Sequence, residues 1–207
     1  MTDDPTQVDD HTQVQEFFGA RAARWDTRFA GDGPAYAAAV AAMGLPSGGA
    51  VLDAGCGTGR ALPYLRTAVG SSGTVLGADL TWEMLTEAAG KRRDHRALLT
   101  QSDVARLPLR SSVLDGVFAA GLIAHLPHPA GNLRELARTV RPGGLLALFH
   151  PVGRAALAAR QGRQLTDSDL RAEPNLRPLL AGSGWSLLSY VDQDDRFLAL
   201  ASRDTPA

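Results

Sequence analysis

A glycine-rich segment after a short apolar run is the part of the sequence that points most directly to chemistry. Residues 51–59 read VLDAGCGTG, in which the apolar run ends in Asp53 and glycines follow at three alternate positions. Such glycines let the backbone turn sharply and let a ligand lie against it, because no Cβ stands in the way. The spacing is G-x-G-x-G, and Arg60 stands where the dinucleotide-binding pattern G-x-G-x-x-G has its third glycine.

Carboxylates at the ends of the next two apolar runs indicate a nucleoside ligand. Asp79 ends the run that begins at residue 74, and Asp103 follows the run at 97–101. Parallel strands end at one edge of a sheet, so Asp79 is expected beside the glycine-rich segment, where it can accept hydrogen bonds from both hydroxyls of a ribose. Asp103 can accept from an adenine amino group, or it can simply cap a turn, as Asp often does at strand ends.

The order and spacing of these motifs resemble the class I S-adenosylmethionine-dependent methyltransferases, in particular the small-molecule type similar to the ubiquinone and menaquinone biosynthesis methyltransferases. The resemblance covers about residues 14–203. It rests on four segments, which read VLDAGCGTG, LGADLTWEML, SDVARLPLRSSVLDGVFAAGLIAHL and LRELARTVRPGGLLALFHP. It implies that S-adenosylmethionine is the cofactor, that S-adenosylhomocysteine is its product, and that a small organic molecule accepts the methyl group.

The resemblance also implies which residues bind the cofactor. Asp53 and the glycine-rich loop would hold the methionine end, Asp79 the ribose, and Asp103 the adenine amino group. Arg24 and Trp25, in the segment RARWD, resemble the family's lid over the cofactor, although an apolar helix face can also bury a tryptophan for packing alone. The expected cofactor-binding residues are Trp25, Asp53, Ala54, Gly55, Cys56, Gly57, Gly59, Asp79, Leu80, Met84, Asp103, Val104, Ala120 and Gly121.

Two histidines are the candidates for chemistry on the acceptor side. His150 directly follows an apolar run, and His125 lies in the segment GLIAHLPHP. An imidazole whose pKa is near neutrality can act as a general base on a hydroxyl or an amine, but either histidine can instead only shape the pocket. Methyl transfer from a sulfonium is an in-line displacement that needs alignment and exclusion of water. No His, Cys, Asp or Glu cluster has metal-ligand spacing, so we expect no metal.

Short apolar runs that alternate with helical stretches predict the elements that position these residues. Strands are expected near residues 50–54, 74–78, 97–101, 116–120 and 145–149, and helices near 60–69, 81–90 and 129–140. This alternation is typical of βαβ units, and the runs 185–191 and 196–202 around a DQDD turn predict a β-hairpin. We therefore expect an α/β fold: a Rossmann-like, seven-stranded, mostly parallel sheet with a C-terminal antiparallel hairpin and helices on both faces.

The chain is expected to form one catalytic domain with an N-terminal extension. Residues 1–10 carry four Asp and almost no apolar side chains, which predicts a disordered tail. Residues 11–45 are expected to form a helical lid and residues 46–207 a single methyltransferase core, which matches a chain of 207 residues.

The stretch from His150 to about Asp169 is the part of the chain least like anything familiar, and the acceptor is expected between it and the lid. Thr166 and Asp169 predict a capping box at the start of a helix that Pro174 and Pro178 would break or restart.

Composition and charge argue against several other classes. The formal net charge is −1 at pH 7, so no global positive field gathers a nucleic acid. No apolar run approaches the roughly 20 residues that a membrane-spanning helix needs. Cys56 is the single cysteine and no secretory leader opens the chain, which favours a cytoplasmic location. We expect a small-molecule partner, no nucleic acid, no membrane, and a monomer or homodimer.

Two other functions stay open at this point. Because the acceptor side offers no compelling catalytic residue, the chain could be a non-catalytic, regulatory module that binds S-adenosylmethionine. An NAD-dependent oxidoreductase shares the same βαβ logic. The atom that accepts the methyl group, an oxygen, a nitrogen or a carbon, is open as well, because a fold does not fix a substrate.

Overall fold

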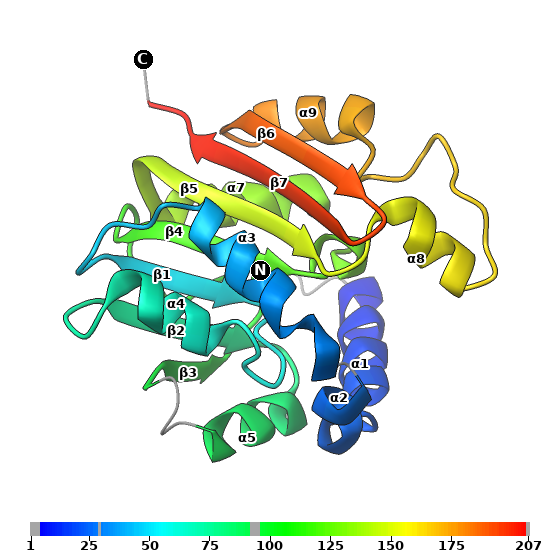
Figure 1. The fold of residues 1–207 in the computed structure, drawn as a ribbon, viewed down its shortest axis with the longest axis horizontal. Coiled ribbons are helices and arrows are strands. Elements are labelled where there is room, and N and C mark those ends of the chain that lie inside the picture. Colours follow the sequence, from blue (N-terminus) through cyan, green and yellow to red (C-terminus); the bar gives the residue numbers. More distant parts are fainter. Residues whose placement is uncertain (1–4, 29, 92–95, 206–207) are drawn as a thin grey trace.

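A seven-stranded sheet forms the centre of the molecule (Figure 1) in this computed structural model, which describes residues 5–28, 30–91 and 96–205. The strand order is β3-β2-β1-β4-β5-β7-β6. The strands are β1 (Ala50–Ala54), β2 (Thr74–Asp79), β3 (Leu98–Gln101), β4 (Leu114–Ala120), β5 (Val140–His150), β6 (Trp185–Gln193) and β7 (Arg196–Arg203). Strands β1 to β5 are parallel, and β7 lies antiparallel between β5 and β6. The predicted Rossmann-like sheet with a C-terminal antiparallel hairpin is confirmed.

Helices cover both faces of the sheet, as predicted (Figure 1). On one face, α3 (Gly33–Ala42) packs against α4 (Leu62–Val69) and β5. On the other, α7 (Pro129–Thr139) packs against β5 and against α9 (Glu173–Ala181), which also contacts β6. Successive residues of one strand serve the two faces: Leu52 belongs to the apolar core with α7 and α9, whereas Val51 belongs to the core with α3 and α4.

The first two helices lie beside the carboxyl ends of the strands. Helices α1 (Pro5–Gly19) and α2 (Ala22–Arg28) both pack against α5 (Trp82–Gly90), the helix that connects β2 to β3. Helix α3 follows a short 3₁₀ turn, η1 (Ala30–Asp32), and packs into the core.

The N-terminal region therefore differs in two ways from the expected division. Residues 5–10, expected in a tail, are helical in α1, because a proline is well suited to the first turn of a helix, where its missing N–H has no partner to lose. Residues 1–4 of that tail lie outside the described residues. Helix α3, expected in the lid, buries Tyr36 and Val40 in the core instead.

In the segment after β5, the capping box predicted from Thr166 and Asp169 is wrong. The segment contains a short helix, α8 (Arg154–Arg160), and then a loop of turns that leads to α9 at Glu173. The predicted capping box does not form, because Thr166 contacts Ser168 and Asp169 binds Arg171. The helix begins seven residues after Thr166, with Pro174 in its first turn, where proline is tolerated.

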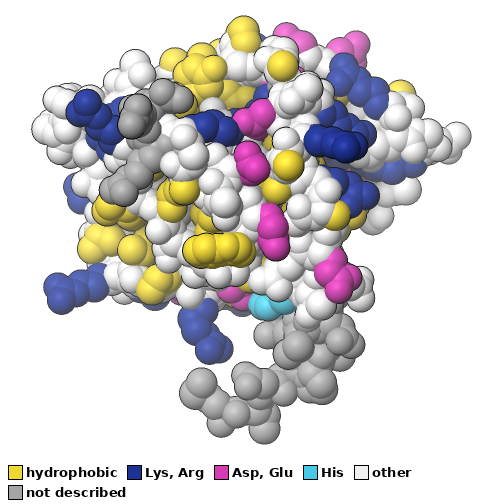
Figure 2. Space-filling view, turned by 90° about the horizontal axis from the view of Figure 1, so that it is seen from below, with side chains coloured by type: hydrophobic (Ala, Val, Ile, Leu, Met, Phe, Trp, Pro, Cys, Tyr) yellow, Lys and Arg dark blue, Asp and Glu magenta, His cyan; other side chains and the backbone are white. Residues whose placement is uncertain are grey.

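The carboxyl ends of β1 and β4 lie side by side at the point where the strand order reverses, which is where open α/β sheets bind ligands. A 3₁₀ turn, η2 (Ile123–His125), follows β4 at this edge. Figure 2 shows a face on which the described basic, acidic and apolar side chains are interspersed. Within the described part of the chain, every helix is too short or too polar to cross a membrane.

Candidate functional site

A cavity of about 1070 Å³ opens at the carboxyl edge of the sheet. Its walls come from the ends of β1, β2, β4 and β5, from α1 and α2, and from the segment that follows β5. Pockets for drug-sized ligands usually measure about 300–1000 Å³. This cavity is therefore large enough for a cofactor and a second molecule beside it.

The glycine-rich loop after β1 has a backbone that other residues would strain. Gly55, Gly57 and Gly59 have φ angles of +67°, +51° and +80°, in the region that favours glycine. Gly55 and Gly57 line the cavity. Gly59 does not, because it faces the protein: a Cβ there would lie 3.0 Å from Leu62 and 3.2 Å from Ala88.

Asp79 connects the end of β2 to this loop. Its Oδ2 accepts a hydrogen bond from the backbone N–H of Gly57, and its Oδ1 accepts one from the N–H of Thr81, both at 2.8 Å. Burial raises the pKa of the carboxyl, and the two backbone N–H groups oppose that rise. Each carboxylate oxygen has more than one lone pair, so Asp79 can still accept from ribose hydroxyls at the cavity wall.

Asp53 is a buried carboxylate without a partner among the described residues. It is 1% exposed, it lines the cavity, and neither oxygen has a hydrogen bond. Burial, and then the charge of Asp79, raise the pKa of Asp53 well above its ordinary value. A buried, unpaired carboxylate is costly, so the site is built for a cationic or donor group that is not part of the chain. The ammonium at the methionine end of S-adenosylmethionine fits this requirement.

The adenine end of the site is formed by residues after β2 and β3. Asp103 caps a turn by accepting from the N–H of Ala105 at 2.8 Å, so the turn-capping alternative describes its Oδ1. Its Oδ2 lies 3.3 Å from Nε2 of His11 on α1. Leu80 and Val104 also line the cavity, where they can cover the two faces of an adenine ring.

Helix α2 is fastened to the glycine-rich loop through Asp26, which the sequence analysis did not single out. The hydroxyl of Thr58 donates to Asp26, and Lys91, just after α5, forms an ion pair with the same carboxylate. Lys91 also donates to the carbonyl of Thr58 at 2.7 Å. We call Asp26, Thr58 and Lys91 the lid latch. These bonds hold α2, which carries Trp25, over the cavity.

His150 lies at the end of β5, where it lines the cavity. Its Nδ1 is 2.8 Å from the carbonyl oxygen of Val152 and 3.1 Å from the backbone nitrogen of the same residue. Burial is the main cause that lowers the pKa of His150, and the charge of Arg171 adds to it. The imidazole is therefore neutral at neutral pH and can accept a proton.

His125 lies after β4, in η2, and also lines the cavity. Its ring packs edge-on against Phe18 of α1, with 5.2 Å between ring centroids. Partial burial and then the charge of Arg171 lower the pKa of His125. The contact with Phe18 gives this histidine a part in holding α1 over the cavity.

The structure brings nearly all of the expected site residues together. The two exceptions among the expected cofactor-binding residues are Ala54 and Gly59, which lie outside the cavity wall. Ala54 is 0% exposed, because its side chain points into the core layer with α7. Cys56 lines the cavity, but its N–H donates to the carbonyl of Ala78 and its buried thiol lies over Gly77. Burial raises the pKa of that thiol well above its ordinary value, which argues against a reactive thiolate.

Several cavity residues were missed because the sequence gives little signal for them. Tyr36 reads as one more core residue of an apolar helix, yet its ring, 5.0 Å from that of Phe149, forms part of the wall. Arg171 lies in a segment without periodicity. No group of three or more His, Cys, Asp or Glu residues in the described chain could hold a metal ion.

Comparison with known proteins identifies the family of the chain. A family model described as "Methyltransferase domain" matches residues 52–148. A 2-phytyl-1,4-naphtoquinone methyltransferase of Synechocystis is 32% identical over 165 residues, which cover 74% of this chain and 68% of that protein. The solved structure of a SAM-dependent methyltransferase from Aquifex aeolicus has a TM-score of 0.65 and 26% identity, over 78% of this chain and 86% of that one. The chain belongs to the class I S-adenosylmethionine-dependent methyltransferases.

The fold is also shared with a solved structure of lower sequence identity. Magnesium protoporphyrin IX methyltransferase from Synechocystis, solved with bound SAH, superposes with a TM-score of 0.71 at 20% identity, over 94% of this chain and all (100%) of that one. Against several other curated relatives, the chain spans less than half of their length: 32%, 45% and 42% in three cases.

Proposed function

We propose that this protein transfers a methyl group from S-adenosylmethionine to an oxygen, nitrogen or carbon nucleophile of a small organic molecule. The observation that carries the proposal is the buried, unpartnered carboxylate of Asp53 in the wall of the cavity, next to a loop whose glycine conformations leave backbone open to a ligand. When bound, the cofactor supplies an activated methyl group on a sulfonium.

The residues around the cavity divide the binding work between them. Asp53 pairs with the ammonium of the cofactor, and Asp79 accepts from the ribose hydroxyls. Asp103 accepts from the adenine amino group through Oδ2, the oxygen that faces His11 rather than the turn. The remaining length of the cavity, toward His150, is then the place for the acceptor.

The protein's contribution to the reaction is mainly to align the two molecules and exclude water. In-line displacement requires the nucleophile, the methyl carbon and the sulfur to lie on one line, and fixing that geometry lowers the barrier strongly. Helices α1 and α2, the latter held by the lid latch, close the cavity from the solvent side. Ala120 and Gly121, at the end of β4, border the methionine end without large side chains that would fill it.

His150 is proposed as the general base when the nucleophile carries a proton. If Nδ1 donates its hydrogen to the carbonyl of Val152, then Nε2 has a free lone pair and can take the proton. Partial burial keeps the ring neutral at neutral pH, which is the form that a base requires. His125, in η2 after β4, is the second candidate for this role.

The shape of the acceptor follows from the wall of the cavity. Aromatic rings from several elements line it, among them Phe18, Trp25, Tyr36 and Phe149. Such walls bury flat apolar molecules well. The relative named for 2-phytyl-1,4-naphtoquinone supports an acceptor that contains a ring.

The test is incubation of the protein with S-adenosylmethionine and a panel of phenols, quinols and aromatic amines, followed by mass measurement. The proposal expects one acceptor to gain the mass of a CH₂ group while S-adenosylhomocysteine accumulates. Tight cofactor binding without turnover of any acceptor would favour the regulatory module instead. Thermal stabilisation by NAD but not by S-adenosylhomocysteine would favour the oxidoreductase, because a ligand that binds the native state raises its melting temperature.

A further inference from the structure

Beyond the cofactor, the structure places a buried arginine at the acceptor end of the cavity. The side chain of Arg171 is 9% exposed, yet it lines the cavity. The charge of Arg171 lowers the pKa of both His125 and His150, so its guanidinium acts on the two candidate bases. These histidines lie at the carboxyl ends of β4 and β5, whereas the acidic residues for the cofactor lie at those of β1, β2 and β3.

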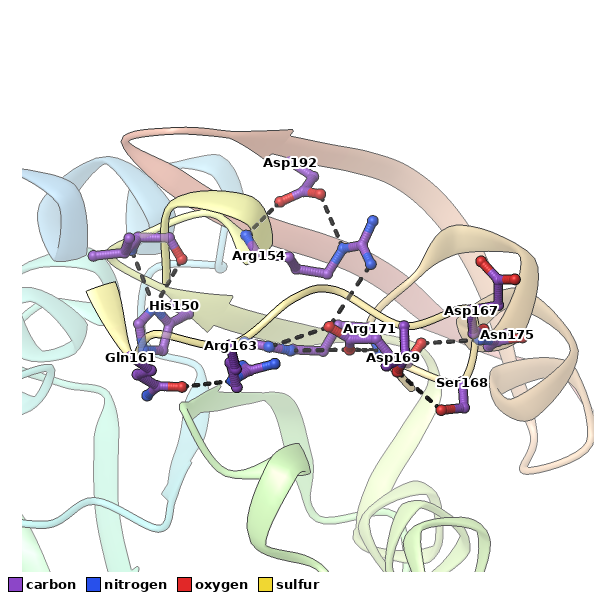
Figure 3. Close-up of polar contacts among 12 residues, drawn as sticks. His150, Arg154, Gln161, Arg163, Asp167, Ser168, Asp169, Arg171, Asn175 and Asp192 are labelled. Carbon is purple, nitrogen blue, oxygen red and sulfur yellow. Dashed lines mark hydrogen bonds and ion pairs between the residues drawn. The ribbon is translucent and has the colours of Figure 1, made fainter. Parts of the chain in front are cut away.

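A series of ion pairs and hydrogen bonds between charged residues holds Arg171 in position (Figure 3). Asp192 of β6 accepts from Nε of Arg154 at 2.9 Å, and Arg154 in turn lies 3.7 Å from Asp169. Asp169 accepts from the backbone N–H of Arg171 at 2.9 Å. Three separate parts of the chain, β6, α8 and the loop before α9, therefore combine to hold one guanidinium.

The guanidinium of Arg171 has donors to spare on its cavity side. Its hydrogen bonds in the described chain go to Asp169 alone, from Nε and one Nη, and both are long at 3.4 Å. An arginine has five N–H donors, so the other Nη can serve a ligand. Asp169 is not part of the cavity wall, so the cavity meets the positive member of this pair.

The rest of the acceptor end adds positive charge. Arg160 and Arg163 line it as well, and neither has an ion pair within the described residues. Arg163 instead donates to Gln161 at 2.7 Å. Asp32, the acidic wall residue whose charge acts on His150, is already paired with Arg60 at 3.3 Å. Positive charge therefore exceeds negative charge where the acceptor would lie.

We propose that the methyl acceptor carries an oxyanion group, a carboxylate or a phosphate, which the guanidinium of Arg171 binds while Arg160 and Arg163 attract it at the rim. This inference rests on the proposed function, because it places the acceptor in the same cavity. Arginine forms forked, charge-assisted hydrogen bonds with both kinds of oxyanion, and these are stronger than bonds between neutral groups. The apolar body of the acceptor then lies against the aromatic walls, with its nucleophile toward the cofactor.

Calorimetry on the protein saturated with S-adenosylhomocysteine tests the proposal with three probes. They are 4-hydroxybenzoate, its neutral analogue 4-hydroxybenzamide, and phenyl phosphate. We expect at least one of the two anions to bind at least about tenfold more tightly than the amide, and the better anion identifies the group. Equal affinity for the amide, or no binding of either anion, would overturn the proposal.

Variants show whether Arg171 is the anchor. Arg171→Gln should weaken binding of the preferred anion at least about tenfold, and it should leave affinity for the amide and for S-adenosylhomocysteine unchanged. Arg177→Gln is the matched control, because Arg177 is exposed on α9, pairs with Glu173 and lies outside the cavity wall.

Since Asp169 loses a partner in the Gln variant, Arg171→Lys serves as a second one that keeps the charge but not the fork. It should weaken binding of the preferred anion about threefold or more. Unchanged anion affinity in either folded variant would overturn the proposal. So would a loss of S-adenosylhomocysteine affinity, because Arg171 would then serve the cofactor. Failure of the unmodified protein to bind S-adenosylhomocysteine would instead contradict the proposed function itself.

Discussion

The carboxylate of Asp79 accepts a hydrogen bond of 2.8 Å from the backbone N–H of Gly57, 22 positions earlier in the chain. This bond ties the end of β2 to the loop that follows β1. The proposed ribose-binding residue and the backbone that lies against the ligand are thereby held as one unit. Asp53, the other acidic residue of this unit, accepts no hydrogen bond from the described residues. Its carboxylate is therefore available to the ligand.

Replacing Asp53 by Asn tests whether its buried carboxylate is unpaired in the ligand-free protein and serves the ligand. The pKa of Asp53 is raised in the folded protein, so the folded state is penalised once pH rises above the ordinary carboxyl pKa, and the penalty grows until pH passes the raised value. Asp53→Asn removes this penalty. Thermal melts of the ligand-free protein should show the variant gaining stability over the unmodified protein as pH rises through that window.

The same variant should bind S-adenosylhomocysteine about 30-fold more weakly or worse, because the ammonium loses its charged partner. Asp195→Asn, at an exposed turn between β6 and β7, is the control. A variant that melts like the unmodified protein at every pH, with unchanged affinity, would show that Asp53 is neither strained nor used.

The sheet and the cofactor end of the site could be predicted from the sequence because their signals are local. Each strand is a short apolar run, and right-handed βαβ connections place the strand ends at one edge. The position of Asp53, Asp79 and Asp103 at that edge could therefore be predicted without information on tertiary contacts. The difference between Gly57, at the cavity, and Gly59, against Ala88, was not visible, because it depends on how α5 packs.

The acceptor end could not be predicted, because tertiary contacts determine it. Arg171 owes its position to Asp169 and, through Arg154, to Asp192 on another strand. The same contacts explain the wrong capping box: an Asp that is engaged by Arg171 is not available to start a helix.

The lid latch should control how fast the cofactor leaves. Lys91→Ala removes the ion pair with Asp26 and the bond to the carbonyl of Thr58, so α2 opens more easily. Both ionic side chains are a third or more exposed, so the pair adds less than about 1 kcal/mol to overall stability. Stopped-flow tryptophan fluorescence should show release of S-adenosylhomocysteine accelerated about threefold or more. Arg177→Ala, which breaks an exposed pair on α9, should leave release unchanged, and an unchanged rate in Lys91→Ala would show that α2 does not gate the site.

A general base at His150 predicts a particular pH profile. Because the pKa of His150 is lowered in the ligand-free protein, kcat/KM for a protonated nucleophile should rise with pH through that lowered pKa and be constant at neutral pH. His150→Gln should reduce kcat about 100-fold or more and abolish the acidic limb, with little change in KM. The exposed His128 provides the control variant His128→Gln. A His150→Gln enzyme that keeps its kcat within a few-fold and retains the limb would assign His150 to shaping the pocket.

A substitution at Trp185 should lower the stability of the fold without changing cofactor affinity. Trp185 is 0% exposed, and its Nε1 donates to the carbonyl of Leu133 on α7 at 2.9 Å. Trp185→Phe leaves that buried carbonyl unpaired and opens a small cavity, which should cost about 2 kcal/mol and lower the melting temperature by roughly 4–8 °C. Trp82→Phe, at a tryptophan that is 63% exposed, should change stability by less than about 0.5 kcal/mol. S-adenosylhomocysteine affinity should be the same in both folded variants, and a loss in Trp185→Phe would mean that the hairpin shapes the cofactor site.

The most direct test of the cofactor assignment is isothermal calorimetry with S-adenosylhomocysteine on the unmodified protein and on Asp79→Ala. The account predicts one site per chain in the unmodified protein and affinity at least about 30-fold weaker in the variant, since both the ribose contact and the bond to Gly57 are lost. An absence of binding heat in the unmodified protein, or equal affinity in the folded variant, would contradict it.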